Sequence, residues 1–385
     1  MELALTAEQR LVRDTVRDYA RGTLEKRGRD MDHRGEFPRK AMEELRKLGM
    51  MGPLVPPGYG GAGLDKVSYC LMLEELAWAD ASTCVTLAVH TSVATHPILW
   101  FGSEELKKRY LPRFARGEML GCFAVTEPHA GSDVAAMTTT ATRDGDEYVL
   151  RGEKTFITNA SHADVAIVGA KTAPDEGHRG VSLFAVDLAS KGVARGEPEA
   201  KMGLRASDTG SLAFDDVRVP AANLVGQENG GFRYLMRVLN SSRVGIGAQA
   251  TGIAQRALDE ALWYAKDRHA FGVPIGSFQA LQWMLADVAM GIEAARLLTF
   301  QAASHEDRGR LGAAEASACK VFASELATRA ANVAVQVFGG SGYITDYPVE
   351  RLLRDARVTE IYEGTSEIQR LIIARQALGA LERGG

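Results

Sequence analysis

The feature that most constrains the fold of this chain is a β-rich stretch enclosed between two helical regions. From about Gly121 to Gly226, short runs of alternating or β-branched residues are separated by turn residues, a pattern typical of strands. On both sides of this stretch, apolar residues recur at helical spacing. At about 150 residues per domain, a chain of 385 residues should form two or three domains. We therefore expect a mainly α protein with a central β domain.

Local signals predict where individual elements begin and end. In the first helical region, the Gly- and Pro-rich stretch from Gly49 to Gly63 and the prolines Pro97 and Pro112 predict breaks between four or five helices. In the β-rich stretch, Asp144-Gly145 between two β-prone runs predicts a tight hairpin, because glycine adopts the positive φ that a primed turn requires.

The last region predicts a bundle of long helices. We expect helices from about Ser277 to His305 and from Ala313 to Phe338, and shorter ones after Pro348 and Thr365. With the helix that precedes Gly272, these elements predict an antiparallel bundle of four main helices.

Composition and charge exclude several classes of protein. Hydrophobic residues make up 46% of the chain and charged residues 24%, which is typical of a globular protein and not of a disordered one. The net charge of -4, with both signs interspersed, gives no support to a nucleic-acid-binding or polybasic membrane role. The four cysteines show no zinc-ligand spacing, so we expect reduced, mostly buried thiols. The N-terminal residues lack a leader pattern and no window approaches about 18 uninterrupted apolar residues, so we expect a cytoplasmic protein.

The common sequence motifs of metal, nucleotide and serine-nucleophile chemistry are absent from the sequence. No histidine pair has ligand spacing near a carboxylate, so we expect no metal site. Neither a G-x-S-x-G elbow nor a Walker lysine loop is present. Gly245, Gly247 and Gly252 resemble a dinucleotide fingerprint only superficially, because no strand precedes them, and close helix packing explains them better.

The segment around Glu363 is the strongest candidate for chemistry. Ser366 and Gln369 fit a capping box at the start of a helix, and Gly364 just before them can take unusual backbone angles. This arrangement places Glu363 on a loop beside exposed amides, where its carboxylate can face a cavity. The pattern alone leaves open a second interpretation, in which Glu363 is a solvated loop acid near a helix N-terminus.

The chain resembles the acyl-CoA dehydrogenase family, a family of flavoproteins, over nearly its whole length. The motifs that carry this resemblance are Val125–Asp133 (VTEPHAGSD), Phe156–Asn159 (FITN), Asp267–Gly272 (DRHAFG), Gln336–Gly340 (QVFGG) and Tyr362–Thr365 (YEGT). The resemblance implies an N-terminal helical domain at 1–120, a middle β-barrel domain at 121–230 and a C-terminal four-helix bundle at 231–385. This order agrees with the order expected from periodicity.

The resemblance implies α,β-dehydrogenation of a saturated acyl-CoA to the trans-2-enoyl-CoA, with Glu363 as the base that removes the α-proton. The β-hydride passes to flavin N5, and the backbone N–H at Glu363 helps to polarise the thioester carbonyl, with Tyr362 and Gly364 shaping the approach. Tyr362 as plain packing remains an open alternative. Desolvation raises the basicity of such a carboxylate while a helix N-terminus favours its anion, so the sequence leaves the net direction open.

The resemblance also implies an FAD site and a substrate site. One wall of the flavin site is assigned to Phe123, Val125, Thr126, Gly131, Ser132, Phe156, Ile157 and Thr158. Thr365 and Glu367 are expected to contact the FAD of their own subunit, and a neighbouring subunit is expected to contribute Arg268, Phe271, Gln279, Gln336, Gly339 and Gly340. Ser132 and Arg243 are the expected contacts of the CoA thioester. Without the resemblance, Arg268 is a helix C-terminal charge.

Two positions depart from many relatives. Phe156 stands where many members carry tryptophan, and His129 stands where glycine is common; a surface-turn role for His129 remains open. Ser242 occupies the position at which long-chain and isovaleryl members carry their base. Serine there, with glutamate at 363, favours the short- or medium-chain type.

The partners implied by the resemblance are an acyl-CoA substrate, electron-transfer flavoprotein as electron acceptor, and further copies of the chain in a homotetramer. The implied process is fatty acid β-oxidation. Two alternatives stay open: an acyl-CoA oxidase of the same fold, and a non-catalytic FAD-binding scaffold. Peroxide release would identify the oxidase, and the intact motif around Glu363 argues against the scaffold.

Overall fold

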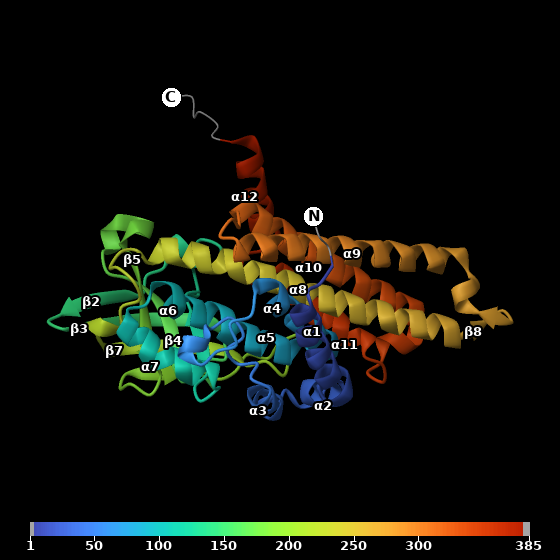
Figure 1. Cartoon of the computed structure of the whole chain (residues 1–385), viewed down its shortest axis with the longest axis horizontal. Coiled ribbons are helices and arrows are strands. Elements are labelled where there is room, and N and C mark those ends of the chain that lie inside the picture. Colours follow the sequence, from blue (N-terminus) through green and yellow to red (C-terminus); the bar gives the residue numbers. More distant parts are fainter. Residues whose placement is uncertain (1–3, 380–385) are drawn as a thin grey trace.

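The computed structural model describes residues 4–379 and places a β domain at one end of a long helical body (Figure 1). The N-terminal region is helical. Its α-helices are α1 (Ala7–Tyr19), α2 (Glu25–Arg34), α3 (Arg39–Lys47), α4 (Lys66–Ala79), α5 (Ala81–Val89), α6 (Thr95–Phe101) and α7 (Glu104–Ala115). The expected interruption between Gly49 and Gly63 is present, with a single 3-10 turn at Pro57–Tyr59.

The predicted break at Pro112 is wrong, because α7 continues through this residue to Ala115. Pro112 lies in the last turn of the helix, where only a little helix remains to be disturbed, and its carbonyl still accepts the amide of Arg116 at 3.1 Å. Pro97 is also helical, in the first turn of α6, directly after a widened π-helical turn at His90–Ala94. The predicted break at Pro97 is therefore wrong too, because the widened turn just before it accommodates a residue that lacks an N–H and would clash with a regular preceding turn.

Residues 81–101 form one continuous helical run of 21 residues that is long and apolar enough to cross a membrane, with a mean hydropathy of 1.2. Within the structure, 78% of an 18-residue apolar window of this run is buried against other parts of the chain. Its apolar composition is therefore explained by packing in the protein core, as for the core helix of a globular domain.

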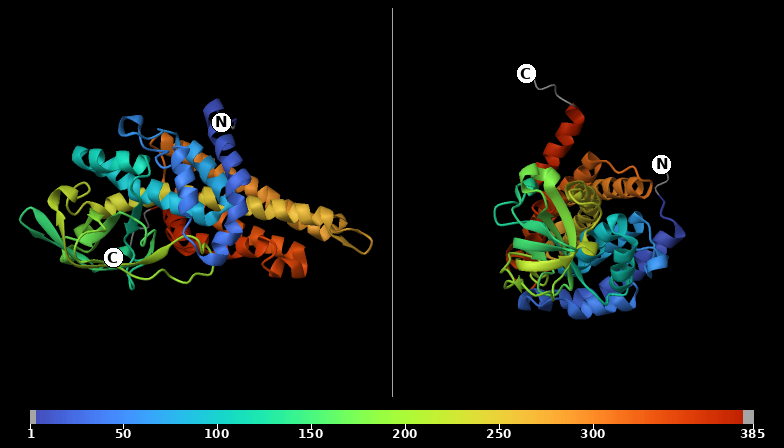
Figure 2. Two further views of the ribbon diagram at one scale, coloured as in Figure 1. Left: turned by 90° about the horizontal axis from the view of Figure 1, so that it is seen from below. Right: turned by 90° about the vertical axis from the view of Figure 1, so that its left-hand side faces the viewer.

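The middle region is a curled, mixed sheet. Its strands are β1 (Gly121–Ala124), β2 (Thr140–Asp144), β3 (Glu147–Thr158), β4 (Val165–Lys171), β5 (Val181–Asp187), β6 (Val193–Arg195) and β7 (Thr209–Pro220). They pair in the order β1-β4-β2-β3-β7-β6, with β5 on the other side of β4. The predicted hairpin is confirmed: Asp144 pairs with Glu147, and Gly145 between them has a φ of 64°. Figure 2 shows the sheet from its own end of the molecule, with the helices behind it.

The C-terminal region is dominated by three long helices. They are α8 (Gly231–Asp267), α9 (Gln279–Asp307) and α10 (Ala313–Phe338), followed by the shorter α11 (Val349–Arg357) and α12 (Ser366–Leu378). A small hairpin of β8 (His269–Ala270) and β9 (Val273–Pro274) joins α8 to α9. With 37 residues, α8 is about 55 Å long at 1.5 Å per residue, so it reaches from the β domain to the far end of the bundle (Figure 1).

Glycines let α8 approach α4 closely, as expected from the sequence. A Cβ at Gly252 would lie 2.2 Å from the carbonyl oxygen of Glu74, and one at Gly245 would lie 3.1 Å from Leu73. Gly247 faces the bundle instead, where a Cβ would lie 2.9 Å from the hydroxyl of Thr299. The glycine pattern therefore serves helix packing.

We expect Gly252→Ala to destabilise the protein, because the new methyl group must push α8 away from the backbone of α4. The expected loss is about 1–3 kcal/mol in the free energy of unfolding, measured by chemical denaturation. Gly22→Ala is the matched control, since nothing lies within 4 Å of a Cβ at this helical glycine. The control should be neutral or stabilising by up to about 1 kcal/mol. Equal stability of both variants would contradict the packing argument.

Candidate functional site

The loop that carries Glu363 has an unusual backbone. Glu363 has a φ of 53°, in the left-handed region that L-residues rarely adopt, and Gly364 follows with a φ of 98°. The left-handed conformation costs a non-glycine residue about 1–2 kcal/mol, so the surrounding structure must hold it. One such restraint comes from α8, where Nε of Arg243 donates to the carbonyl oxygen of Glu363 at 3.2 Å.

The carboxylate of Glu363 is turned inward against α8. The hydroxyl of Ser242 donates to its Oε2, and no described residue donates a hydrogen bond to Oε1. Burial raises the pKa of Glu363; the hydrogen bond from Ser242 and the positive charges of Arg243, Lys320 and Lys66 act in the opposite direction. Glu363 is half-buried, and its hydrogen bond to Ser242 argues against the interpretation as a freely solvated loop acid. Ser242, noted in the sequence only because it cannot be a base, is the hydrogen-bond partner of the base candidate.

The predicted capping box is shifted by one residue. Thr365 is the N-cap of α12, and its side chain accepts the amide of Ile368 at 3.4 Å. Ser366 is already the first helical residue, and the side chain of Gln369 turns back to the loop instead of to the cap. The signal for a helix start was correct, but either of two adjacent hydroxyl residues can cap a helix. Here Thr365 has the extended backbone of an N-cap, with φ -58° and ψ 161°.

The backbone and ring next to Glu363 have distinct environments. Among the described residues, the amide of Glu363 has no hydrogen-bond acceptor, so it is free to donate to a ligand. The hydroxyl of Tyr362 donates to Oε1 of Gln249 on α8 at 2.7 Å, and its ring packs on the helical core. This contact supports the packing interpretation of Tyr362 without excluding a ligand on the other side of the ring.

The predicted flavin wall lies on two neighbouring segments of the β domain. Phe123 and Val125 lie on or just after β1, and the amide of Thr155 on β3 donates to the carbonyl oxygen of Thr126 at 2.9 Å. The pairing of β3 with β7 shifts register between Lys154 and Ile157. Within this irregularity Phe156 takes a φ of 56° and its side chain is 66% exposed.

The other members of the predicted wall differ in what they can offer. The side chain of Ile157 is buried in the core of the sheet, whereas Gly131 and Ser132 are exposed in the turn after β1. The hydroxyls of Thr126 and Thr158 make no hydrogen bond within residues 4–379. Free hydroxyls, an exposed aromatic face and an open glycine turn suit a planar ring with polar edges, so this wall fits a flavin.

A buried ion pair that the sequence analysis missed holds this wall in place. Nζ of Lys154 on β3 lies 2.7 Å from Oε1 of Glu127, and both side chains are fully buried. The same carboxylate accepts the amides of Thr138 at 2.6 Å and Thr139 at 2.9 Å. Burial opposes the ionisation of Glu127, but Lys154 and the threonine donors outweigh it and lower its pKa to about 2. Glu127 therefore ties the turn after β1 to β3 and to the segment before β2.

His129 lies at the edge of this ion pair. Its Nε2 is 3.6 Å from Oε2 of Glu127, and its side chain is 53% exposed. This position fits the surface-turn role that the sequence left open.

The second group of predicted cofactor residues lies at the other end of the molecule. The β8–β9 hairpin and the C-terminal end of α10 lie far from the β domain (Figure 1). All six residues of the group are exposed, Phe271 to 95%. They are Arg268, Phe271, Gln279, Gln336, Gly339 and Gly340. Arg268 has no acidic partner among the described residues, and a Cβ at Gly339 or Gly340 would meet open space. One chain does not bring this group to the flavin wall.

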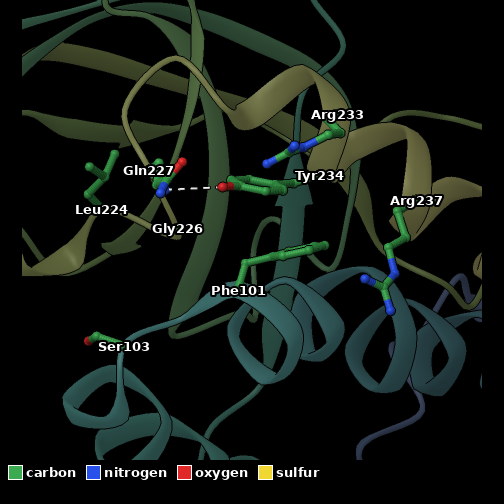
Figure 3. A pocket seen from close by; sticks show the side chains of 8 residues that line it. All are labelled: Phe101, Ser103, Leu224, Gly226, Gln227, Arg233, Tyr234 and Arg237. Atoms are coloured by element: carbon green, nitrogen blue, oxygen red, sulfur yellow. Dashed lines mark hydrogen bonds between the residues drawn. The ribbon is translucent and has the colours of Figure 1, made fainter.

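The described residues offer no metal site, and the cavity at the α6–α7 corner lies away from the predicted site residues. Among residues 4–379, no group of three or more His, Cys, Asp or Glu residues could hold a metal ion. A cavity of about 640 Å³ lies between the α6–α7 corner and the first turns of α8 (Figure 3). Its rim carries Arg233 and Arg237, and on one side the rings of Phe101 and Tyr234 stack at 4.2 Å. No residue predicted for catalysis or cofactor binding lines it.

Known proteins are similar to this chain over almost its whole length. Residues 6–118, 122–217 and 229–378 match the family models of the N-terminal, middle and C-terminal domains of acyl-CoA dehydrogenases. An acyl-CoA dehydrogenase of Bacillus subtilis is 50% identical over 97% of this chain and 99% of its own length. The mitochondrial short-chain specific acyl-CoA dehydrogenase of Rattus norvegicus is 43% identical over 97% of this chain and 91% of its own length. The structure of butyryl-CoA dehydrogenase from Megasphaera elsdenii has a TM-score of 0.97 at 40% identity, covering 98% of this chain and 100% of that chain.

Proposed function

Because the chain belongs to the acyl-CoA dehydrogenase family, we propose that it converts a saturated short- or medium-chain acyl-CoA to the trans-2-enoyl-CoA, with Glu363 as the base. The protein is an acyl-CoA dehydrogenase, an oxidoreductase that acts on a CH–CH bond of the acyl-CoA, and FAD is its cofactor. The names of the short-chain and butyryl-CoA relatives support the short end of this range. The observation that carries the proposal is the inward carboxylate of Glu363 with one oxygen left free.

Glu363 takes the α-proton on its free oxygen. Ser242 engages Oε2, so Oε1 is available to accept a proton, and burial makes the carboxylate a stronger base than a solvated glutamate. The bound FAD supplies the acceptor for the hydride that leaves the β-carbon. Thr126, Thr158 and Phe156 are proposed to hold its ring, and Thr365 and Glu367 to contact it from the start of α12.

The free amide of Glu363 serves the other half of the reaction. Charge develops on the thioester oxygen as the α-proton leaves, and a fixed N–H donor in a desolvated site stabilises that charge. Gly364 beside it leaves room for the thioester, and Ser132 is proposed to contact the CoA portion. Arg243 is also proposed to contact the CoA thioester. Its Nε already donates to the carbonyl oxygen of Glu363, and its Nη1 donates to the side chain of Asn240.

We further propose that the working unit is a homotetramer whose flavin site is completed by a neighbouring copy. The exposed group around Arg268 and Phe271 supports this. The guanidinium of Arg268 suits a phosphate, has no acidic partner among the described residues, and lies far from the flavin wall of its own chain. Large apolar side chains exposed along α9 supply a surface for association: Trp283, Met284, Met290 and Leu297. Electron-transfer flavoprotein as the acceptor, fatty acid β-oxidation as the process and the cytoplasm as the location belong to the same proposal.

The first prediction concerns the base. In anaerobic mixing with saturated acyl-CoAs of increasing length, the flavin of the native protein should bleach with short or medium chains. Glu363→Gln should lower the bleaching rate by at least about 100-fold while FAD stays bound, because the amide cannot accept the proton. Glu360→Gln is the matched control on the preceding turn, since Glu360 bonds Thr328 and Arg357 and not the loop. Normal bleaching by the Glu363 variant would refute the assignment, and peroxide release in air would identify an oxidase.

The second prediction concerns pH. The ionised form of Glu363 accepts the proton, so kcat/KM should rise with pH through a pKa above that of an ordinary glutamate. Ser242 donates to the carboxylate and favours its ionised form, so Ser242→Ala should raise the pKa further and move this rise to higher pH. Ser324→Ala should leave it in place, because Ser324 on α10 donates to the carbonyl oxygen of Thr359 and bonds none of the groups that shift the pKa of Glu363. A rise at the same or lower pH in Ser242→Ala would contradict the proposed contact.

The third prediction concerns the shared site. If Arg268 serves the flavin of a neighbour, Arg268→Gln and Glu363→Gln should each be inactive alone. Co-expression of the two variants should restore activity, because a mixed pair contains one site with both native residues. Light scattering on a sizing column measures the assembly in parallel. Absence of restoration in a mixed oligomer would show that each site is built by one chain.

A further inference from the structure

Three side chains from three helices hold the two carbonyl groups of the Glu363–Gly364 segment. Nζ of Lys320 on α10 and Nε2 of Gln369 on α12 each donate to the carbonyl oxygen of Gly364 at 2.8 Å. Gln369 also lies 3.3 Å from the carbonyl oxygen of Glu363, which accepts from Arg243 on α8 as well. Two consecutive peptide groups are thus restrained from outside the loop.

Lys320 is an unusual residue for this place. Its side chain is fully buried, yet no carboxylate among the described residues lies within ion-pair distance of it. Burial lowers the pKa of its ammonium group to about 8, which reflects the cost of holding a charge there. Within residues 4–379, the one hydrogen bond of its ammonium group is to the carbonyl oxygen of Gly364. A buried amine without an ionic partner destabilises a fold, so packing and pairing do not account for it.

Gln369 also directs the hydrogen bonds of its side-chain amide to this loop. Its side chain is fully buried, and its amide nitrogen serves both carbonyls. A Cβ at position 364 would lie 2.6 Å from that nitrogen, so the contact requires glycine there. The left-handed φ of Glu363 is unfavourable for a residue with a side chain, whereas glycine adopts the φ of 98° at 364 readily. Together these angles set the directions of the side chain and the free amide of Glu363.

We propose that Lys320 and Gln369 are positioning residues for α-proton abstraction, which fix the backbone of Glu363 so that its carboxylate and amide face the substrate together. This inference rests on the proposed function of Glu363. Neither residue touches the reacting carbons in the proposal; each acts through the peptide groups that it holds. Misplacement of a base by about 1 Å can cost about 100-fold in rate, so small rotations of these peptides matter.

Four variants test the proposal. Lys320→Met removes the donor and the charge, Lys320→Gln keeps a donor without the charge, and Gln369→Leu removes the second donor. Ser324→Ala is the matched control: Ser324 is also buried on α10 and donates to the carbonyl oxygen of Thr359 at 2.9 Å, before the loop. It loses the same kind of bond without releasing Gly364.

The readouts are kcat and KM for the best acyl-CoA, flavin content and thermal midpoint. Lys320→Met and Gln369→Leu should lower kcat by about 10- to 100-fold, the range for losing a hydrogen bond that involves a charged or buried group, while KM changes little. Lys320→Gln should recover part of the loss, and Ser324→Ala should keep native kcat. Because both donors share one carbonyl oxygen, the double variant Lys320→Met/Gln369→Leu should lose less than the product of the single losses.

The outcomes separate this inference from the proposed function. If none of the acyl-CoAs bleaches the flavin of the native protein, the proposed function itself is overturned. A native protein that turns over, with folded and FAD-loaded Lys320→Met and Gln369→Leu at native kcat, overturns only the positioning role. Equal loss of kcat in Ser324→Ala also overturns it, since any buried bond would then suffice. Should Lys320→Met fail to fold, Lys320→Gln and Gln369→Leu decide: native kcat in both overturns the role, and reduced kcat with native flavin content supports it.

Discussion

A partly buried carboxylate held against the long helix α8 is the constraint on which the rest of this structure depends. Nearby hydrogen-bond donors and cations favour the ionised form of an acid in that place, and desolvation favours the neutral form. Here desolvation is the larger effect, so the pKa of Glu363 is raised. The groups that face it come from α8, α10 and α4, so the relative placement of these helices sets its chemistry. Close packing through glycine keeps α4 and α8 in register.

The fully buried carboxylate of Glu127 in the same chain has its pKa shifted in the opposite direction. Glu127 has a lysine at 2.7 Å and accepts several threonine donors, and its pKa falls to about 2. Such a group stays charged at any physiological pH and serves as a structural tie for the wall of the β domain. Glu363 has one strong donor and one free oxygen, which leaves it able to exchange a proton. The difference in local donors separates an acid that stays ionised as a structural tie from one that can take up a proton.

The long axis of the molecule explains why one chain does not bring its two groups of predicted cofactor residues together. The wall formed by β1 and β3 lies at one end, and the exposed group around the β8–β9 hairpin lies at the other (Figure 1). A rigid helix of 37 residues cannot fold back to join them. Association of copies is the means by which such a shape can bring the two groups together.

The sequence by itself determined the order of helical, β and helical regions and the Asp144-Gly145 hairpin, because periodicity and turn chemistry are local properties. It also marked the Glu363 segment as a candidate site. It did not determine that α7 runs through Pro112 or that Thr365, and not Ser366, caps α12. A proline can lie in the last turn of a helix as well as after it, and either of two adjacent hydroxyl residues can cap. Only the tertiary structure showed that Ser242, Lys320 and Gln369 converge on one loop and that Lys154 pairs with Glu127. Those contacts join separate elements, so burial and direction, which no local pattern records, decide which polar side chains meet.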